Sequence, residues 1–183
     1  MVATLQARER SEMDELLLAR LVEGSDGAFN EIYRRYARYV ATIGYRLLGD
    51  DTELDDVVQE TFLEVSSSIE GLSDPRLFKS WLATIAVRCT IRRRSNRKRR
   101  RFLHQALSVL GISRSDPGVR GPVDELYEVL NLLPERTRTP WLLHKVVGES
   151  LPDTAVICGL SLTTAKRRIA EAEARLRRKL DAE

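Results

Sequence analysis

Cysteine and histidine are scarce in this chain. Its 183 residues include two cysteines, Cys89 and Cys158, and two histidines, His104 and His144. Each cysteine falls on an apolar helical face, which indicates small core residues in a reducing compartment and not a disulfide. The histidines are too few and too scattered for a zinc site. We therefore expect no metal, no cofactor and no redox-sensing pair of thiols.

Long apolar runs and alternating patterns are also missing. No stretch of about 18 apolar residues occurs, and the N-terminus lacks the apolar segment of a secretion signal. We therefore expect no membrane span, no secretion and a cytoplasmic location. No segment alternates apolar and polar residues over five positions, so we expect an all-α fold. With 43% hydrophobic and 31% charged residues, the chain has the composition of a globular protein.

Charge is distributed unevenly although the net charge is only +3. Acidic residues dominate the first 70 positions, and basic residues are concentrated in two later blocks. This asymmetry indicates one face for nucleic acid and another face for a different partner.

The stretch from Ser150 to Leu180 has the pattern of a helix-turn-helix. Ser150 and Asp153 form a capping box at the start of a short first helix. Gly159 suits a left-handed C-cap, and Ser161 can cap a second helix two residues later. Two helices joined by a short turn that contains glycine are typical of a helix-turn-helix.

The second of these helices has two distinct faces. Its apolar stripe consists of Leu162, Ala165, Ile169, Ala172, Leu176 and Leu180. Its opposite face and flank carry Thr163, Thr164, Lys166, Arg167 and Arg168. Short hydroxyls and long cations at the start of a second helix suit insertion into a DNA major groove. A solvated basic helix in a bundle is the alternative.

A predicted helix from Glu53 to Ile69 presents an outward face in addition to its apolar stripe. This face carries Asp55, Asp56, Gln59, Glu60 and Leu63. Acids mixed with an amide and a leucine favour contact with another protein. An ordinary solvated acidic face is equally compatible with the periodicity. A metal site is a third alternative, although no histidine or carboxylate from another helix obviously converges on this face.

A basic run follows the next predicted helix. Residues 70–76 contain Gly71 and Pro75 and predict a loop, after which the helix with Phe78 and Trp81 begins. From Arg92 to Arg101 there are eight cations in ten residues. Such a density of charge repels itself unless a polyanion neutralises it, which indicates a nucleic-acid backbone. A membrane-surface or localisation tract is disfavoured because no apolar anchoring face adjoins it.

The pattern predicts two small helical domains joined by a flexible linker, the C-terminal one a helix-turn-helix. We expect a loose extension at 1–11, a helical domain at 12–103, a linker at 104–122 and a second domain at 123–183. Within the first domain, a helix from Glu12 to Glu23 should bury Met13, Leu16, Leu17 and Leu21. In the second, Pro140 should either kink its helix or force a new start near Thr139.

These motifs resemble the bacterial sigma factors of the extracytoplasmic-function group. The resemblance rests on DDVVQETFLEV (Asp55–Val65), FKSWLATIA (Phe78–Ala86), the arginine run, LLPER (Leu132–Arg136) and CGLSLTTAKRRI (Cys158–Ile169). It covers about two-thirds of the chain in the family's order. The chain departs from the family pattern at Glu149, usually leucine, at Thr154, usually apolar, at Thr164, often glycine, and at Pro140, which interrupts a helix that is normally uninterrupted.

The resemblance implies a transcription initiation factor that binds core RNA polymerase, recognises promoters and promotes DNA melting without catalysing a reaction. Contact with the clamp helices of the largest polymerase subunit would involve Asp55, Asp56, Gln59, Glu60 and Leu63. The minus-ten DNA element would be bound by Ser73, Asp74, Arg76, Lys79, Arg88, Arg92 and Arg93. The minus-thirty-five element would be bound by Thr163, Thr164, Lys166, Arg167 and Arg168. The polymerase flap and an anti-sigma protein are further expected partners.

Two other classes of function stay open from the sequence. A free-standing helix-turn-helix regulator would bind operator DNA as a dimer, although no strong heptad seam is present to form one. A metal-dependent nuclease would use the carboxylates of residues 50–60 and would cleave nucleic acid without a partner.

Overall fold

The computed structural model describes residues 15–109 and 122–181, and every regular element within these ranges is a helix. The first domain contains a helix at 15–22, α2 (Asp26–Leu48), α3 (Leu54–Ser68) and α4 (Phe78–Val109). Two short 3₁₀ turns, η1 (Ile69–Gly71) and η2 (Pro75–Leu77), connect α3 to α4. The second domain contains α5 (Pro122–Asn131), α6 (Glu135–Leu142), a π-helical turn η3 (Leu143–Val147), α7 (Leu151–Ile157) and α8 (Leu162–Leu180). The predicted all-α class is confirmed.

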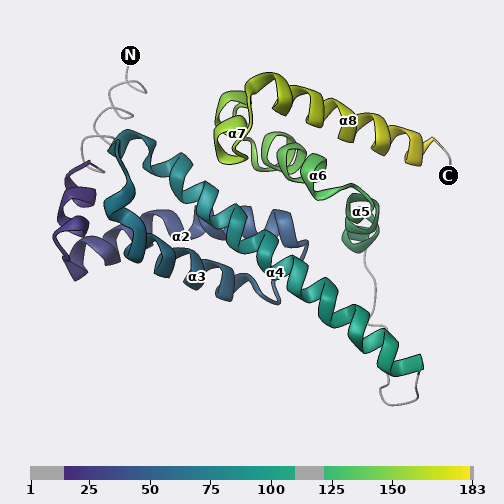
Figure 1. Cartoon of the computed structure of the whole chain (residues 1–183), viewed down its shortest axis with the longest axis horizontal. Helices are drawn as coiled ribbons and strands as arrows, with labels where there is room; N and C mark the ends of the chain where they lie inside the picture. Colours follow the sequence, from purple (N-terminus) through teal and green to yellow (C-terminus); the bar gives the residue numbers. More distant parts are fainter. Residues whose placement is uncertain (1–14, 110–121, 182–183) are drawn as a thin grey trace.

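The two domains lie side by side along α4. Helices α2, α3 and α4 pack on one another, and α8 packs on α6 and α7 (Figure 1). Helix α4 also contacts α7, while α2 contacts α6 and η3. The sequence predicted two domains and a linker, but it gave no indication of this direct packing between them.

The hydrophobic stripes of the helices form one continuous core. In the first domain the stripes of α2, α3 and α4 bury Ile32, Ile43, Leu47, Val57, Phe62, Val65, Phe78, Leu82, Ile85 and Cys89. In the second domain the buried set includes Leu130, Leu142, Leu143, Ala155, Ile157, Ala165, Ile169 and Ala172. Both cysteines are free thiols, with Cys89 buried and Cys158 half-buried. The burial of these stripes therefore determines which faces of the helices point outward.

The first helix differs from the sequence prediction in its register. Leu17, Leu18 and Leu21 are buried, whereas Leu16 is 59% exposed. The prediction that Leu16 packs inward is therefore wrong, and Met13 of the same predicted set lies outside the described residues. The helical period allows either Leu16 or Leu18 to lie on the apolar face beside Leu17 and Leu21. Packing against the rest of the core selects Leu18.

Pro140 lies inside α6 and does not force a new start. The helix begins at Glu135 and continues through Pro140 into the wider turn η3. Proline supplies no N–H, so the regular ladder of hydrogen bonds is interrupted at Pro140, and the helix widens into the π-helical turn directly after it. Gly148 ends the turn with φ of 90°, and its N–H donates to the carbonyl of Leu143 at 3.1 Å.

The predicted domain boundaries are described only in part. Helix α4 continues to Val109, beyond residue 104 where the predicted linker begins. Residues 110–121 of that linker and the predicted extension at 1–11 lie outside the described residues. The boundaries therefore stay predictions.

Candidate nucleic-acid interface

The helix-turn-helix predicted from Ser150 onward is present with its caps. Ser150 Oγ accepts from the backbone N–H of Asp153 at 3.2 Å and so begins α7. Gly159 follows the helix with φ of 62°, in the left-handed region that glycine adopts without steric cost. Ser161 Oγ accepts from the N–H of Thr164 at 3.2 Å and begins α8. These caps fix the position of the first turns of α8.

The outward face of α8 is narrower than the sequence suggested. Thr163, Lys166 and Arg167 are exposed. Thr164 is half-buried, and its Oγ1 accepts a hydrogen bond from Ser161 Oγ at 2.8 Å, so its hydroxyl completes the cap. Arg168 is half-buried and lines a cavity beside α4. The five predicted DNA residues therefore divide into three on the open face and two at its edge.

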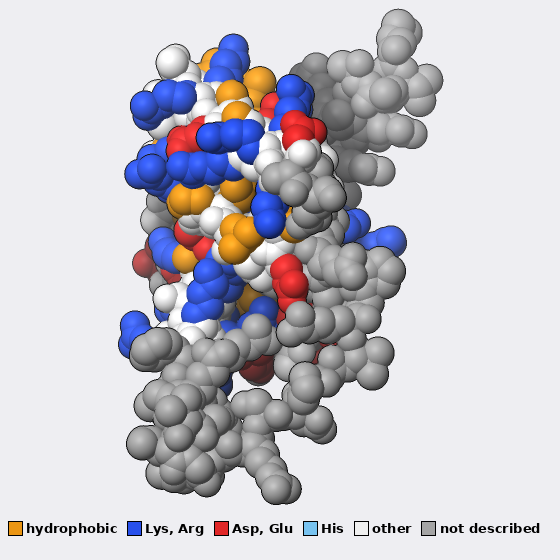
Figure 2. Space-filling view, turned by 90° about the vertical axis from the view of Figure 1, so that its right-hand side faces the viewer, with side chains coloured by type: hydrophobic (Ala, Val, Ile, Leu, Met, Phe, Trp, Pro, Cys, Tyr) orange, Lys and Arg blue, Asp and Glu red, His pale blue; other side chains and the backbone are white. Residues whose placement is uncertain are grey.

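The buried side of α8 largely follows the predicted stripe. Ala165, Ile169 and Ala172 are buried, but Leu162 is 43% exposed, contrary to the prediction. Leu162 is the first residue of α8, and the packed part of the helix begins one turn later. Figure 2 shows Lys and Arg side chains gathered over the upper part of one face of the molecule, with Asp and Glu side chains among them.

The outward face of α3 borders a shallow groove. Asp55, Gln59 and Leu63 line a cavity of about 450 Å³ together with aromatic side chains of α2 and α3, which are Phe29, Tyr33 and Phe62. Leu63 is 63% exposed at its edge. An aromatic floor with an amide, an acid and a leucine at the edge is suited to contact with another protein.

A row of ion pairs joins α4 to carboxylates of α3 and of the segment before it. The pairs are Arg88–Glu64, Arg92–Glu60, Arg93–Asp56 at 2.6 Å, Arg93–Glu60 at 3.0 Å, Arg97–Asp50 at 2.6 Å and Arg100–Glu53 at 2.6 Å. We name this set the α3–α4 ion-pair row. Four arginines of the basic run, Arg92, Arg93, Arg97 and Arg100, therefore have carboxylate partners within the chain, and the expectation that only an outside polyanion can neutralise the run is wrong for these four.

The ion-pair row connects two predicted sites that sequence reasoning kept apart. Glu60 and Asp56 were predicted to contact polymerase, whereas Arg92 and Arg93 were predicted to contact DNA. Burial raises the pKa of Glu60, but hydrogen bonds from Arg93 and Arg92 and their charges outweigh it and hold the pKa below its ordinary value. Asp56, Glu60 and Glu64 of α3 are thus held by arginines. The described residues contain no group of three or more His, Cys, Asp or Glu placed to hold a metal ion.

The loop before α4 positions the remaining predicted minus-ten residues. Asp74 caps the start of η2, and it accepts three hydrogen bonds from Arg76, from the backbone N–H at 3.0 Å, from Nε at 3.0 Å and from Nη2 at 2.9 Å. These bonds hold the pKa of Asp74 below its ordinary value. Ser73 is exposed near them. Lys79 turns toward the second domain, with Nζ 4.8 Å from the ring centroid of Tyr39 and 3.7 Å from Glu149.

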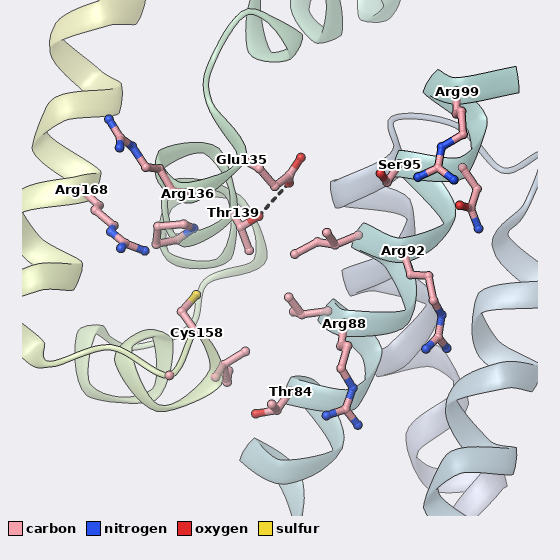
Figure 3. Close-up of a pocket in the computed structure, with 16 residues that line it drawn as sticks. Thr84, Arg88, Arg92, Ser95, Arg99, Glu135, Arg136, Thr139, Cys158 and Arg168 are labelled. Carbon is pink, nitrogen blue, oxygen red and sulfur yellow. Dashed lines mark hydrogen bonds between the residues drawn. The ribbon is translucent and has the colours of Figure 1, made fainter. Parts of the chain in front are cut away.

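A cavity of about 740 Å³ separates part of α4 from α6, α7 and α8. Figure 3 shows its walls, with Thr84, Arg88, Arg92, Ser95 and Arg99 from α4 opposite Arg136, Thr139, Cys158 and Arg168. Thr139 donates a hydrogen bond to Glu135 at 2.9 Å across one turn of α6 (Figure 3). Burial raises the pKa of the Cys158 thiol to about 11, so the thiol is protonated at neutral pH.

Comparison with known proteins now identifies both domains. Residues 32–100 match the model of Sigma-70 region 2, and residues 124–176 match the model of Sigma-70 region 4. The chain is 32% identical over 133 residues to the ECF RNA polymerase sigma factor EcfG of Rhodopseudomonas palustris, covering 71% of this chain and 72% of that protein. This chain belongs to the extracytoplasmic-function sigma factors. The presence of both regions does not favour the alternative of a free-standing dimeric regulator.

Two further comparisons extend along almost the whole sigma factor. RNA polymerase sigma factor CnrH of Cupriavidus metallidurans is 28% identical over 184 residues, covering 94% of this chain and 96% of that protein. The solved structure of CnrH in complex with the cytosolic domain of CnrY matches with a TM-score of 0.69 and 26% identity, covering 93% of this chain. Sigma factors bind core RNA polymerase and direct it to promoters. No helix within the described parts of the chain is both long enough and apolar enough to cross a lipid bilayer.

Sequence reasoning missed the residues that join the two domains of the sigma factor. Tyr39, Tyr127 and Arg138 gave no signal, since an arginine is rarely buried and the tyrosines fit ordinary helix stripes. Glu149 did give a signal, because it stands where the family usually has leucine. The structure accounts for it as a partner of Tyr39 and Lys79.

Proposed function

We propose that the two domains of this sigma factor divide promoter recognition between them. In this proposal α8 reads the minus-thirty-five element through Thr163, Lys166 and Arg167. The observation that carries it is that these three side chains are exposed on the first turns of the second helix of a capped helix-turn-helix. Thr164 and Arg168 contribute at the edge, Thr164 by holding the cap and Arg168 by reaching a phosphate.

The minus-ten element is assigned to the loop before α4 and to the start of α4. Ser73, Asp74 and Arg76 lie together in the loop, and a base turned out of the DNA stack can be held there by polar contacts. Lys79, Arg88, Arg92 and Arg93 follow along α4 and would contact the melted strand. All four cations have carboxylate partners, Lys79 in Glu149 and the three arginines in the ion-pair row, so DNA phosphates would replace those partners.

The polymerase contact is assigned to the outward face of α3. The exposure of Asp55, Gln59 and Leu63 around an aromatic groove supports direct contact of these three with the clamp helices. Asp56 and Glu60 belong to the same face, but they also hold Arg93, so they would serve both surfaces. Region 4 would contact the polymerase flap.

The sigma factor performs no chemistry in this proposal, because phosphoryl transfer belongs to the polymerase. It acts where core polymerase is found, in the cytoplasm. An anti-sigma protein is a further proposed partner, and the similarity to CnrH, whose structure is a complex with the cytosolic domain of CnrY, supports it.

One experiment tests the function as a whole. Purified protein is mixed with bacterial core RNA polymerase, and gel filtration and promoter-dependent run-off transcription are measured. We expect co-elution and a transcript that requires the sigma factor. Failure to form a complex with core polymerase would refute the proposal, and nucleic-acid cleavage by the protein alone would contradict the absence of chemistry.

Two sets of variants test the division between the domains. Asp55→Asn combined with Leu63→Ala should weaken core binding about tenfold or more, because a charged contact and an anchoring leucine are lost. The matched control is Glu70→Gln with Leu16→Ala, which alters an exposed acid and an exposed leucine outside that face. Arg167→Ala should weaken minus-thirty-five DNA binding about tenfold and leave core binding unchanged, with Arg38→Ala as its control. Loss of the same activity by both test variants would contradict the division.

A further inference from the structure

Glu149 lies at the contact between the two domains. The residue is 8% exposed, and Oε1 accepts a hydrogen bond from the hydroxyl of Tyr39 on α2 at 2.8 Å. Lys79, at the start of α4, lies 3.7 Å from the same carboxylate oxygen and 4.8 Å from the ring centroid of Tyr39. A carboxylate and an aromatic face thus surround a cation that the proposed function assigns to minus-ten DNA.

A second group of contacts joins the domains at the C-terminal end of α2. The last carbonyls of a helix have no partner within the helix. Here the hydroxyl of Tyr127 donates to the carbonyl of Arg46 at 3.3 Å, and Arg138 Nη2 donates to the carbonyl of Leu47 at 2.9 Å. Both donors come from the second domain, so the second domain caps a helix of the first.

The packed arrangement limits the distance between the two DNA-binding surfaces. Ser161, the N-cap of α8, lies twelve positions after Glu149, and such a segment spans at most about 43 Å when fully extended. The numbering of the minus-ten and minus-thirty-five elements implies a separation of about 25 base pairs. At about 3.4 Å per base pair, this corresponds to about 85 Å of straight duplex. While Glu149 stays beside Lys79, α8 therefore cannot reach the upstream element of a promoter whose downstream element lies at Lys79.

From these contacts we infer that Glu149 is an intramolecular latch that holds the two domains together and occupies Lys79 until polymerase and DNA separate them. The inference rests on the proposed function, because it assumes that both promoter elements are contacted at once. The carboxylate of Glu149 takes the place that a DNA phosphate would take at Lys79. The family's usual leucine at this position offers no such charge.

The latch has a consequence for binding to core polymerase. If only the separated form binds, the apparent dissociation constant equals the intrinsic constant divided by the separated fraction. A substitution that removes the Tyr39–Glu149–Lys79 contact raises this fraction and should tighten the apparent binding. A contact that only stabilises the fold would not tighten binding when it is removed.

The test measures binding of full-length protein to immobilised core RNA polymerase. Glu149→Leu removes the carboxylate and should bind core about tenfold more tightly, and Tyr39→Phe removes only the hydroxyl and should bind about threefold more tightly. The gain in affinity for core polymerase in the double variant should be smaller than the product of the two single-variant gains, because both substitutions break the same contact. Glu173→Leu is the matched control, since Glu173 pairs with Lys145 inside the second domain at 3.0 Å, and it should bind like wild type.

The outcomes separate the latch from the proposed function. Wild-type binding to core with no gain in either Glu149→Leu or Tyr39→Phe would overturn the latch and leave the proposed function standing. Absence of wild-type binding would overturn the proposed function itself. Small-angle scattering of the free wild-type protein gives an independent check, because a curve that fits only separated domains would overturn the latch without any use of polymerase.

Discussion

Gly49 ends α2 directly beneath the ring of Tyr127. Its φ is 94°, in the left-handed region, and its N–H donates to the carbonyl of Tyr45 at 2.8 Å. A Cβ atom at this position would lie 2.5 Å from Cδ1 of Tyr127. The absent side chain therefore serves two purposes, since it permits the backbone turn and leaves room for a side chain of the other domain.

Gly49→Ala should consequently lower the free energy of unfolding by about 2–4 kcal/mol, through backbone strain and through displacement of the Tyr127 ring. Gly24→Ala is the matched control, because Gly24 also has a positive φ, 81°, and a Cβ there would meet no atom within 4 Å. The control should lose only about 1 kcal/mol, from strain alone. Urea unfolding measures both, and equal losses would show that the contact with Tyr127 is unimportant.

Arg138 is fully buried, yet it is poorly satisfied as a cation. Its Nε and Nη1 have no hydrogen-bond partner among the described residues, although Glu135 lies 3.8 Å from Nη1. Burial, followed by the charge of Arg94, lowers the pKa of Arg138 to about 10. We therefore expect Arg138→Met, which keeps most of the volume, to remain within about 1 kcal/mol of wild type in unfolding free energy. Arg138→Ala should lose about 2–3 kcal/mol more, because it leaves a cavity. A larger loss for methionine than for alanine would contradict this view.

Acid should weaken the α3–α4 ion-pair row at Glu60. Its pKa is lowered in the folded protein, so its contribution to stability is present above the unfolded value near 4.5 and is lost as the pH falls through the lowered folded value. Wild type should therefore lose more unfolding free energy than Glu60→Gln between pH 7 and about pH 3, as measured by urea unfolding. Glu70→Gln, which alters an exposed carboxylate, should follow wild type. Identical pH profiles for wild type and Glu60→Gln would exclude this role for the pair.

The cap of α8 should affect both stability and DNA recognition. Ser161→Ala removes the acceptor of the Thr164 N–H and the donor to the Thr164 hydroxyl, and a lost N-cap costs about 1 kcal/mol. Fraying of the first turn displaces Thr163, so binding to minus-thirty-five DNA should weaken about fivefold in a fluorescence anisotropy titration. Ser66→Ala, on the exposed side of α3, is the control and should leave both quantities unchanged. An unchanged affinity in Ser161→Ala would show that the first turn does not need its cap.

The features that the sequence predicted correctly depend on nearby residues. Ser150, Gly159 and Ser161 act on backbone groups within three residues, and the apolar stripe of α3 follows from helical periodicity alone. Such patterns are visible in a single sequence because their cause is local. The family resemblance then added an expected role for each outward face.

The features that the sequence did not predict depend on residues far apart along the chain. Tyr39 and Glu149 are separated by 110 positions, and Arg138 and Leu47 by 91. The sequence assigns Arg93 to a DNA contact without any sign of its ion pair with Asp56, which is 37 positions away. A charged side chain on an outward helical face has the same periodicity whether water, DNA or another helix covers it, so only the packing of the helices distinguishes these cases.

The α3–α4 ion-pair row also determines how strongly salt should influence DNA binding. An arginine that leaves Glu60 or Asp56 for a phosphate releases the cation condensed on the DNA, but the carboxylate left behind gathers a cation from solution. The net release is therefore smaller than the number of basic side chains along α4 would suggest. The affinity of this sigma factor for a melted strand should accordingly depend less steeply on ionic strength than its arginine-rich sequence implies.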